Sequence, residues 1–120
     1  MAGKTYKPKD YMRLIGDAIK RSLKKDSLII FFGSVVDGNL RRTSDIDVAI
    51  YCREGLSSIE YLQILDQIEG LPILRDVDLI NICEIKDKEF LKNILERGKI
   101  WTGSKELLED LKRRIKNLEK

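Results

Sequence analysis

The chain has 120 residues, of which 42% are hydrophobic and 36% are charged, as in a globular domain with a heavily charged surface. Its 23 basic and 20 acidic residues leave a net charge of +3, which is compatible with a phosphate-bearing ligand but is no nucleic-acid footprint by itself. The longest apolar run, residues 28–32, is far shorter than the roughly 18 to 20 residues that a bilayer span needs. Histidine is absent, so any catalysis must use carboxylates, hydroxyls, lysine or the backbone.

The N-terminus and the cysteines favour a cytoplasmic protein without a membrane segment. The opening stretch MAGKTYKPKD has no apolar signal core, and we interpret residues 1–8 as a mobile basic tail of a single domain spanning residues 1–120. Cys52 and Cys83 lie within apolar runs, where reduced thiols behave as small buried hydrophobic groups. Neither a disulfide framework nor a zinc site is expected.

The first part of the chain alternates between helical and strand patterns. Apolar spacing predicts a helix over residues 10–24, with Asp10 as its N-cap. A continuous apolar run predicts a buried strand over residues 27–32, and a polar connection over residues 33–44 leads to a second strand over residues 45–52.

The rest of the chain continues this alternation. The elements expected are a helix from Ser57 or Ser58 to Gly70, a strand over 76–83, a helix over 86–96, a short edge strand over 99–102 and an amphipathic helix over 104–120 capped by Ser104. The expected fold class is α/β (α+β), a small mixed β-sheet flanked by helices.

Two aspartates stand two residues apart in the second predicted strand. Asp45 and Asp47 point to one face of that strand, because side chains alternate along it. Carboxylates held this close repel each other unless a cation lies between them. A divalent metal would meet that need, and all-oxygen ligation favours Mg²⁺ or Mn²⁺ over zinc. The alternative is a solvated, inert pair on an exposed strand face.

Two further segments could join this pair. Asp78 completes a three-carboxylate cluster if its strand lies beside the second one, and such a cluster suits phosphoryl chemistry assisted by two metal ions. Gly33 and Ser34 follow the first strand, where a glycine permits close approach and N–H and hydroxyl groups can donate to phosphate oxygens. A short helix beginning near Ser34 would add its dipole. Taken alone, a Gly-Ser pair after a strand is an ordinary turn.

The combined spacing resembles a known signature. Gly-Ser, ten residues, Asp-x-Asp and a later strand aspartate are typical of the DNA polymerase beta-like nucleotidyltransferases. The stretch FFGSVVDGNLRRTSDIDVAIY is similar to the minimal nucleotidyltransferases of the MNT type, the antitoxin halves of HEPN/MNT toxin–antitoxin pairs. The resemblance covers roughly residues 28–101 and implies a nucleotidyltransferase fold for the domain.

The resemblance also implies an activity. The expected reaction is Mg²⁺-dependent transfer of AMP from ATP to a tyrosine hydroxyl of a partner HEPN toxin, with two metal ions and with Mn²⁺ as a possible substitute. Two alternatives stay open: a non-catalytic antitoxin that blocks its toxin by binding, and a nucleotidyltransferase acting on a small molecule or RNA. Nucleic acid is not expected as a direct partner. The implied site residues are phosphate-binding Gly33 and Ser34, and catalytic, metal-binding Asp45, Asp47 and Asp78.

The chain departs from the family pattern at one position. Family members commonly carry a basic residue three positions after the serine, where this chain has Asp37. Arg41 and Arg42 are candidates to supply that positive charge to the nucleotide, and otherwise are solvated loop residues. The departure bears on nucleotide affinity more than on the fold.

Three other features have structural interpretations. Tyr51 shares the strand face of the aspartates and is expected to pack under a helix rather than stack on a base. Trp101 is expected in the core or an interface. The last helix has a basic outer face, interpreted as a solvated surface or, alternatively, as a toxin-binding surface: Lys112, Arg113, Arg114 and Lys116.

Overall fold

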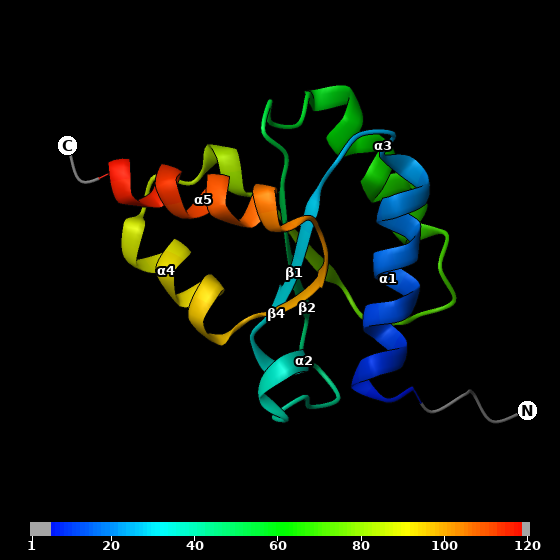
Figure 1. Cartoon of the computed structure of the whole chain (residues 1–120). Helices are drawn as coiled ribbons and strands as arrows, with labels where there is room; N and C mark the ends of the chain where they lie inside the picture. Colours follow the sequence, from blue (N-terminus) through cyan, green and yellow to red (C-terminus); the bar gives the residue numbers. More distant parts are fainter. Residues whose placement is uncertain (1–5, 119–120) are drawn as a thin grey trace, which may run out of the picture.

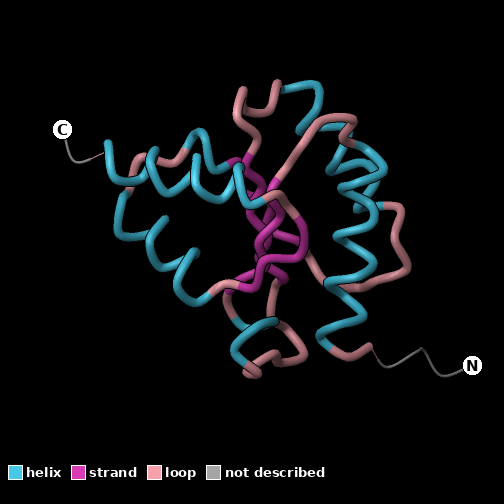
Figure 2. The backbone as a smooth tube through the Cα atoms, in the orientation of Figure 1, coloured by secondary structure: helices cyan, strands magenta, loops and turns pink. Residues whose placement is uncertain are grey.

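The computed structural model describes residues 6–118 and places a four-stranded sheet between two pairs of helices (Figure 1). The strand order is β3-β2-β1-β4. β1 (Leu28–Phe32) pairs antiparallel with β2 (Ile46–Tyr51) and with β4 (Lys99–Thr102), whereas β3 (Val77–Asn81) runs parallel to β2. Figure 2 traces the strands through the middle of the molecule. The expected mixed sheet and its short edge strand are confirmed.

Helices cover both faces of the sheet (Figure 1). One face carries α1 and α3, the other carries α4 and α5, and the short α2 lies at one end of the sheet. No helix described between residues 6 and 118 is long and apolar enough to cross a membrane. The helical bounds are α1 (Pro8–Ser22), α2 (Ser34–Asp37), α3 (Ser58–Glu69), the 3₁₀ turn η1 (Ile82–Glu84), α4 (Lys88–Arg97) and α5 (Lys105–Asn117).

Two apolar layers explain why the central strands are continuously hydrophobic. Ile29 and Phe31 of β1 face the α1/α3 layer, and Leu28 and Ile30 face the α4/α5 layer. Because successive side chains of a strand point to opposite faces, a strand buried on both faces needs apolar residues at every position. The run that predicted a buried strand is therefore the centre of the sheet.

The start of α1 corrects one expectation. The helix begins at Pro8, whose fixed φ suits the first helical position, so Asp10 is not the N-cap. Asp10 instead lies in the first turn and accepts a hydrogen bond from the Lys7 N–H at 2.8 Å. The predicted tail over residues 1–8 lies mostly outside the described residues, and its last residue already belongs to α1.

The third strand ends two residues earlier than its apolar run. The Asn81 side-chain oxygen accepts a hydrogen bond from the Cys83 N–H at 3.3 Å and turns the chain into η1. Cys83 is consequently only half-buried, whereas Cys52 is fully buried, so the expectation of two buried thiols is right for Cys52 alone. Both cysteines are free, as expected.

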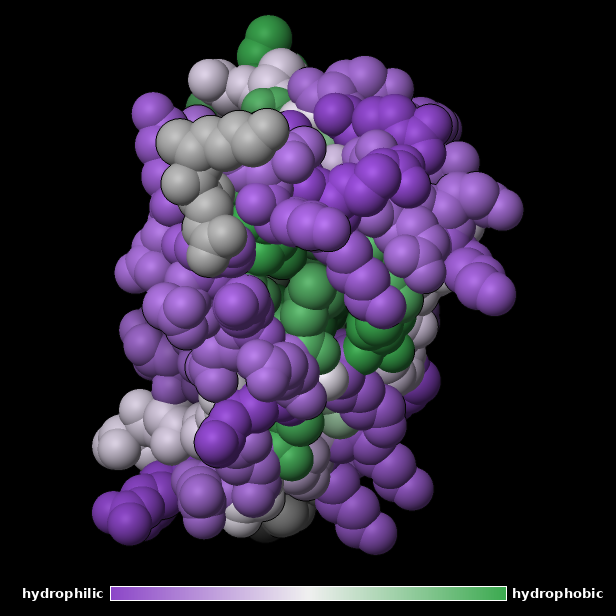
Figure 3. Space-filling view, turned by 60° about the vertical axis from the view of Figure 1, so that its left-hand side comes forward, coloured by the Kyte–Doolittle hydropathy of each residue, from purple (hydrophilic) through white to green (hydrophobic). Residues whose placement is uncertain are grey.

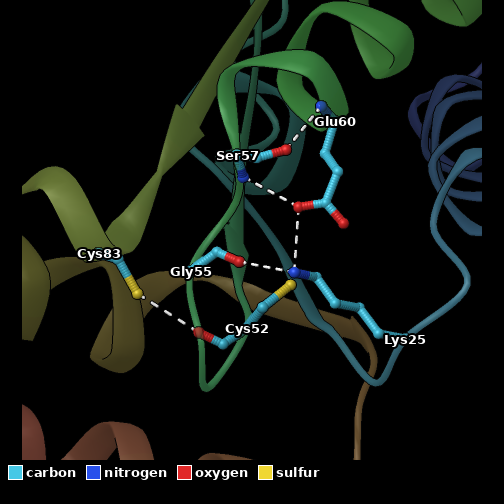
Figure 4. Close-up of polar contacts among 6 residues, drawn as sticks. All are labelled: Lys25, Cys52, Gly55, Ser57, Glu60 and Cys83. Carbon is cyan, nitrogen blue, oxygen red and sulfur yellow. Dashed lines mark hydrogen bonds and ion pairs between the residues drawn. The ribbon is translucent and has the colours of Figure 1, made fainter.

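A polar cross-link fastens the end of the sheet where β1 begins and β2 ends (Figure 4). The Lys25 ammonium donates to the Gly55 carbonyl at 2.8 Å and to Glu60 Oε1 at 3.0 Å. Ser57, one of the two predicted helix starts, caps α3, and Glu60 completes the capping box by accepting from the Ser57 N–H at 2.9 Å. Hydrogen bonds from Ser57 and Lys25 lower the pKa of Glu60. The hydrogen bond that Lys25 donates to Glu60 in turn raises the pKa of Lys25.

Candidate functional site

Asp47 and Asp78 lie side by side on neighbouring strands. The parallel register of β2 and β3 pairs Asp47 with Asp78, so both side chains project to the same face. That face is the one covered by α4 and α5, because Asp47 lies on the same face of β2 as Ala49 and Tyr51, which pack in the α4/α5 layer. Asp47 is half-buried and Asp78 is exposed. The expected adjacency of these two strands is confirmed.

Asp45 lies in the loop that leads into β2, two residues before Asp47. It is exposed and immediately precedes β2, rather than lying within the strand as expected. Burial raises the pKa of Asp47, and the negative charges of Asp78 and then Asp45 raise it further. The charges of Asp78 and Asp45 therefore both act on Asp47 at this end of the sheet.

The donor chemistry fits a hard divalent cation, since all three side chains offer only oxygen atoms. Their mutual repulsion is also what a bound cation would relieve. The side chains do not yet form a closed ligand set: among residues 6–118, no three acidic, cysteine or histidine side chains are grouped tightly enough to hold a metal ion.

Gly33 brings the turn after β1 against Asp47. Its backbone has φ 75° and ψ −150°, a conformation that residues with a side chain rarely adopt. A Cβ atom at Gly33 would overlap the Asp47 carboxylate, so only glycine lets the turn pass this close. Ser34 then begins α2, and the Gly33 carbonyl accepts the Val36 and Asp37 N–H groups at 3.0 Å. The structure therefore brings the Gly-Ser turn and the acidic pair together.

Arg75 holds the loop that leads into Asp45, a role that sequence reasoning missed. Its Nη1 donates to the Ser44 carbonyl at 2.8 Å and also to the Arg41 carbonyl. The guanidinium lies over the Tyr11 ring of α1, 5.1 Å from its centroid. No local pattern could have revealed these contacts, because they join positions more than 30 residues apart in the sequence.

The other predicted charges are not brought to the carboxylates. Asp37, Arg41 and Arg42 are all exposed. Arg41 contacts the rest of the loop through its backbone, whose N–H donates to Ser44 Oγ at 3.0 Å. Within residues 6–118, no hydrogen bond or ion pair joins either arginine side chain to the three aspartates.

An aromatic pair borders the acidic pair. Phe32 is the register partner of Asp47 across β1 and β2, and its ring packs edge-on against Phe90 of α4 at 5.9 Å between centroids. Antiparallel partners share a face, so Phe32 gives the site an apolar wall. The sequence offered one usable signal for this, the position of Phe32 at the end of the strand that precedes Gly33.

Tyr51 and Trp101 have the structural roles expected of them. Tyr51 is buried at the opposite end of β2 and donates a hydrogen bond to Asp110 of α5. Burial, followed by that bond, raises the pKa of Tyr51 to about 12. Trp101 packs edge-on against Phe31 at 6.1 Å, next to Gly16 of α1.

The mixed sheet thus carries an acidic pair on adjacent strands, with a glycine turn against it. Residues 17–107 match the family model described as Polymerase beta, Nucleotidyltransferase. The chain belongs to this family, as its sequence resemblance predicted. Among curated proteins, none matches the sequence.

Solved structures with a similar fold include toxin–antitoxin complexes. One, a toxin–antitoxin with AMP-PNP, has a TM-score of 0.72 and 23% identity over 89% of this chain and 85% of that chain. A second contains a tri-AMPylated Shewanella oneidensis HEPN toxin with MNT antitoxin, with a TM-score of 0.68 and 19% identity over 93% and 86% of the two chains. A third, MntA-HepT, has a TM-score of 0.67 and 20% identity over 92% and 86%. At these identities the likeness shows the fold.

Proposed function

We propose that this chain is a Mg²⁺-dependent protein adenylyltransferase that transfers AMP from ATP to a tyrosine hydroxyl of a HEPN-type toxin and thereby acts as its antitoxin in the cytoplasm. The observation that carries the proposal is the in-register pair Asp47 and Asp78, with Gly33 against Asp47, in a chain of the nucleotidyltransferase family. Two proteins of similar fold support the finer assignment, one solved with AMP-PNP and one with a tri-AMPylated HEPN toxin.

In this proposal Asp45, Asp47 and Asp78 would hold two Mg²⁺ ions, for which Mn²⁺ could substitute. When bound, such ions neutralise phosphate charge and lower the pKa of an attacking hydroxyl. Gly33 and Ser34 would hold the phosphates through backbone N–H groups and the serine hydroxyl, next to Asp47. Asp47 is fixed by its half-buried strand position and Asp78 by its register against it.

The reaction proposed is in-line displacement at the α-phosphorus. The acceptor tyrosine oxygen forms a bond to that phosphorus while the bond to the bridging α–β oxygen breaks, and pyrophosphate leaves with the electron pair. We assign the hydroxyl proton to Asp78, because its carboxylate is exposed and an incoming protein can reach it. Orientation of the reactants by the rigid strands would supply much of the rate enhancement.

Arg41 and Arg42 complete the proposed nucleotide site. Both lie in the loop before Asp45, which Arg75 fastens to the start of β3. Their side chains are exposed and could turn to a triphosphate, compensating for Asp37 at the end of α2. A carboxylate at that position disfavours a nearby phosphate, so Asp37 is the feature that favours a second candidate, an antitoxin that acts by binding alone.

The decisive experiment incubates the chain with α-labelled ATP, Mg²⁺ and a HEPN-type protein encoded beside it. Label on a tyrosine of that protein is expected, with loss of label in Asp47→Asn and in Asp78→Asn. The matched control Asp17→Asn changes an exposed aspartate on α1 and should retain transfer. A complex that silences the toxin without label would favour the binding-only antitoxin. Label on RNA or a small molecule would overturn the choice of acceptor.

A further inference from the structure

A groove of about 290 Å³ runs between α4 and α5. Its apolar lining is Leu95 of α4 and Ile115 of α5, and Figure 3, turned toward this side of the molecule, shows apolar residues recessed among hydrophilic ones. Four of its six lining residues are lysines and none is acidic. They are Lys88, Lys92, Lys112 and Lys116.

Helical spacing creates this α4/α5 groove. The inner positions of both helices, such as Leu91 and Leu111, are buried against the sheet. Leu95 stands one turn on from Leu91 and is only half-buried, so the apolar surface continues out into the groove. The basic face of α5 is evident from the sequence, whereas the second basic rim, contributed by α4, is evident only from the packing of the two helices.

The lysines of the groove stand close to one another. Lys112 and Lys116 are four residues apart on α5 and exposed, and exposed Lys92 faces them from α4. Like charges at this helical spacing cost a few tenths of a kcal/mol per pair. A surface that combines an apolar floor with one sign of charge is matched by a ligand with the opposite sign around an apolar stripe.

We propose that the α4/α5 groove binds an amphipathic helix of the partner protein whose apolar stripe is flanked by aspartate or glutamate. Such a helix would insert aliphatic side chains over Leu95 and Ile115 and set its carboxylates against the lysines. This inference rests on the proposed function, because it locates the docking surface for the acceptor protein. α4 also borders the candidate site, because the Phe90 ring packs against Phe32, the register partner of Asp47.

Two other occupants fit the groove less well. A second copy docking through the same groove would bring the two lysine rims together, which charge repulsion opposes. A membrane surface is contacted best by protruding apolar side chains, whereas Leu95 and Ile115 lie in a recess. An acidic helix satisfies the concave shape and the charge at once.

The test uses the full chain and a fluorescein-labelled designed helical peptide, with leucines at i, i+3 and i+7 and glutamates on both flanks. A matched peptide carries lysine at every glutamate position. Fluorescence anisotropy should detect binding of the acidic peptide at least about ten-fold tighter than the basic one, weakening as salt is raised. The double variant Lys92→Glu/Lys116→Glu should lose this preference, and the control Lys105→Glu, exposed on α5 outside the groove, should keep it.

The outcomes separate this inference from the proposed function. Equal binding of both peptides, no binding, or binding that survives Lys92→Glu/Lys116→Glu would overturn the docking inference while leaving AMP transfer intact. Co-sedimentation with phosphatidylcholine–phosphatidylserine vesicles that depends on the same lysines, without peptide binding, would overturn it in favour of a membrane. Asp47→Asn should bind the acidic peptide as wild type does while failing to transfer AMP.

Discussion

Replacing Asp47 by asparagine should make the protein more stable. Asp47 is the register partner of Asp78 on strands that lie about 5 Å apart, and the charge of Asp45 also acts on it. Two charges at that separation repel by about 0.8 kcal/mol in a water-like dielectric and by about 3 kcal/mol at an effective dielectric of 20. Because Asp47 is only half-buried, solvent screening favours the lower end, and we expect a gain of about 1 kcal/mol in the free energy of unfolding.

The gain should depend on pH in a defined direction. The folded pKa of Asp47 lies above its unfolded value, so protonation favours the folded state and the charged form costs stability. The advantage of Asp47→Asn is therefore full above the folded pKa of Asp47. It shrinks as pH falls through that pKa, because the wild-type carboxyl then becomes neutral too.

Urea unfolding at several pH values measures this effect, and thermal unfolding should show a rise of about 3 to 6 °C at neutral pH. The control Asp17→Asn removes an equal charge from an exposed site on α1 and should change stability by less than about 0.5 kcal/mol. An Asp47→Asn variant that is less stable than wild type at pH 7, or whose gain persists unchanged at low pH, would refute the repulsion argument.

Three further predictions concern the supports of the site and the far end of the sheet. Gly33→Ala should lower the free energy of unfolding by about 1 to 3 kcal/mol, measured in urea, and abolish ATP binding measured by calorimetry. The added methyl group would overlap the Asp47 carboxylate, and alanine disfavours the positive φ of this position. Arg75→Ala should raise the KM for ATP several-fold and cost only about 1 to 2 kcal/mol of stability, since it frees the loop before the acidic pair; an unchanged KM would contradict that role. Glu60→Gln should lower stability at neutral pH and match wild type in acid, because Glu60 has a lowered folded pKa and its contact with Lys25 is lost as pH falls through that value; a pH-independent difference would count against it.

Local pattern predicted the fold because the strands that matter are buried on both faces. The runs around Phe31 and Val48 could be recognised without any tertiary information, and alternation placed Asp47 and Asp45 on one side. The end of the third strand was predicted two residues too late because the apolar run continues past the turn that the Asn81 side chain makes. Asp10 was misassigned as an N-cap because the apolar spacing begins only at the following residue.

The site required contacts that no local pattern carries. The sequence placed Asp78 beside the acidic pair only on the condition that its strand neighbours β2, because the register of β3 against β2 is set by the whole sheet. The sequence predicted that Gly33 lets a ligand approach the backbone closely. The structure shows that the absent side chain already makes room for the Asp47 carboxylate. The contacts of Arg75 and the pairing of the Phe32 ring with Phe90 depend on long-range packing, so the sequence could not predict these partners.

The most direct test of the account is a crystal structure of the chain soaked with Mn²⁺ and a non-hydrolysable ATP analogue, read through the anomalous signal of manganese. We expect a manganese peak held by Asp45 and Asp47, with the triphosphate over the turn at Ser34. Manganese bound elsewhere, or a nucleotide seated away from β2 and β3, would contradict the assignment of this end of the sheet as the place where AMP is transferred.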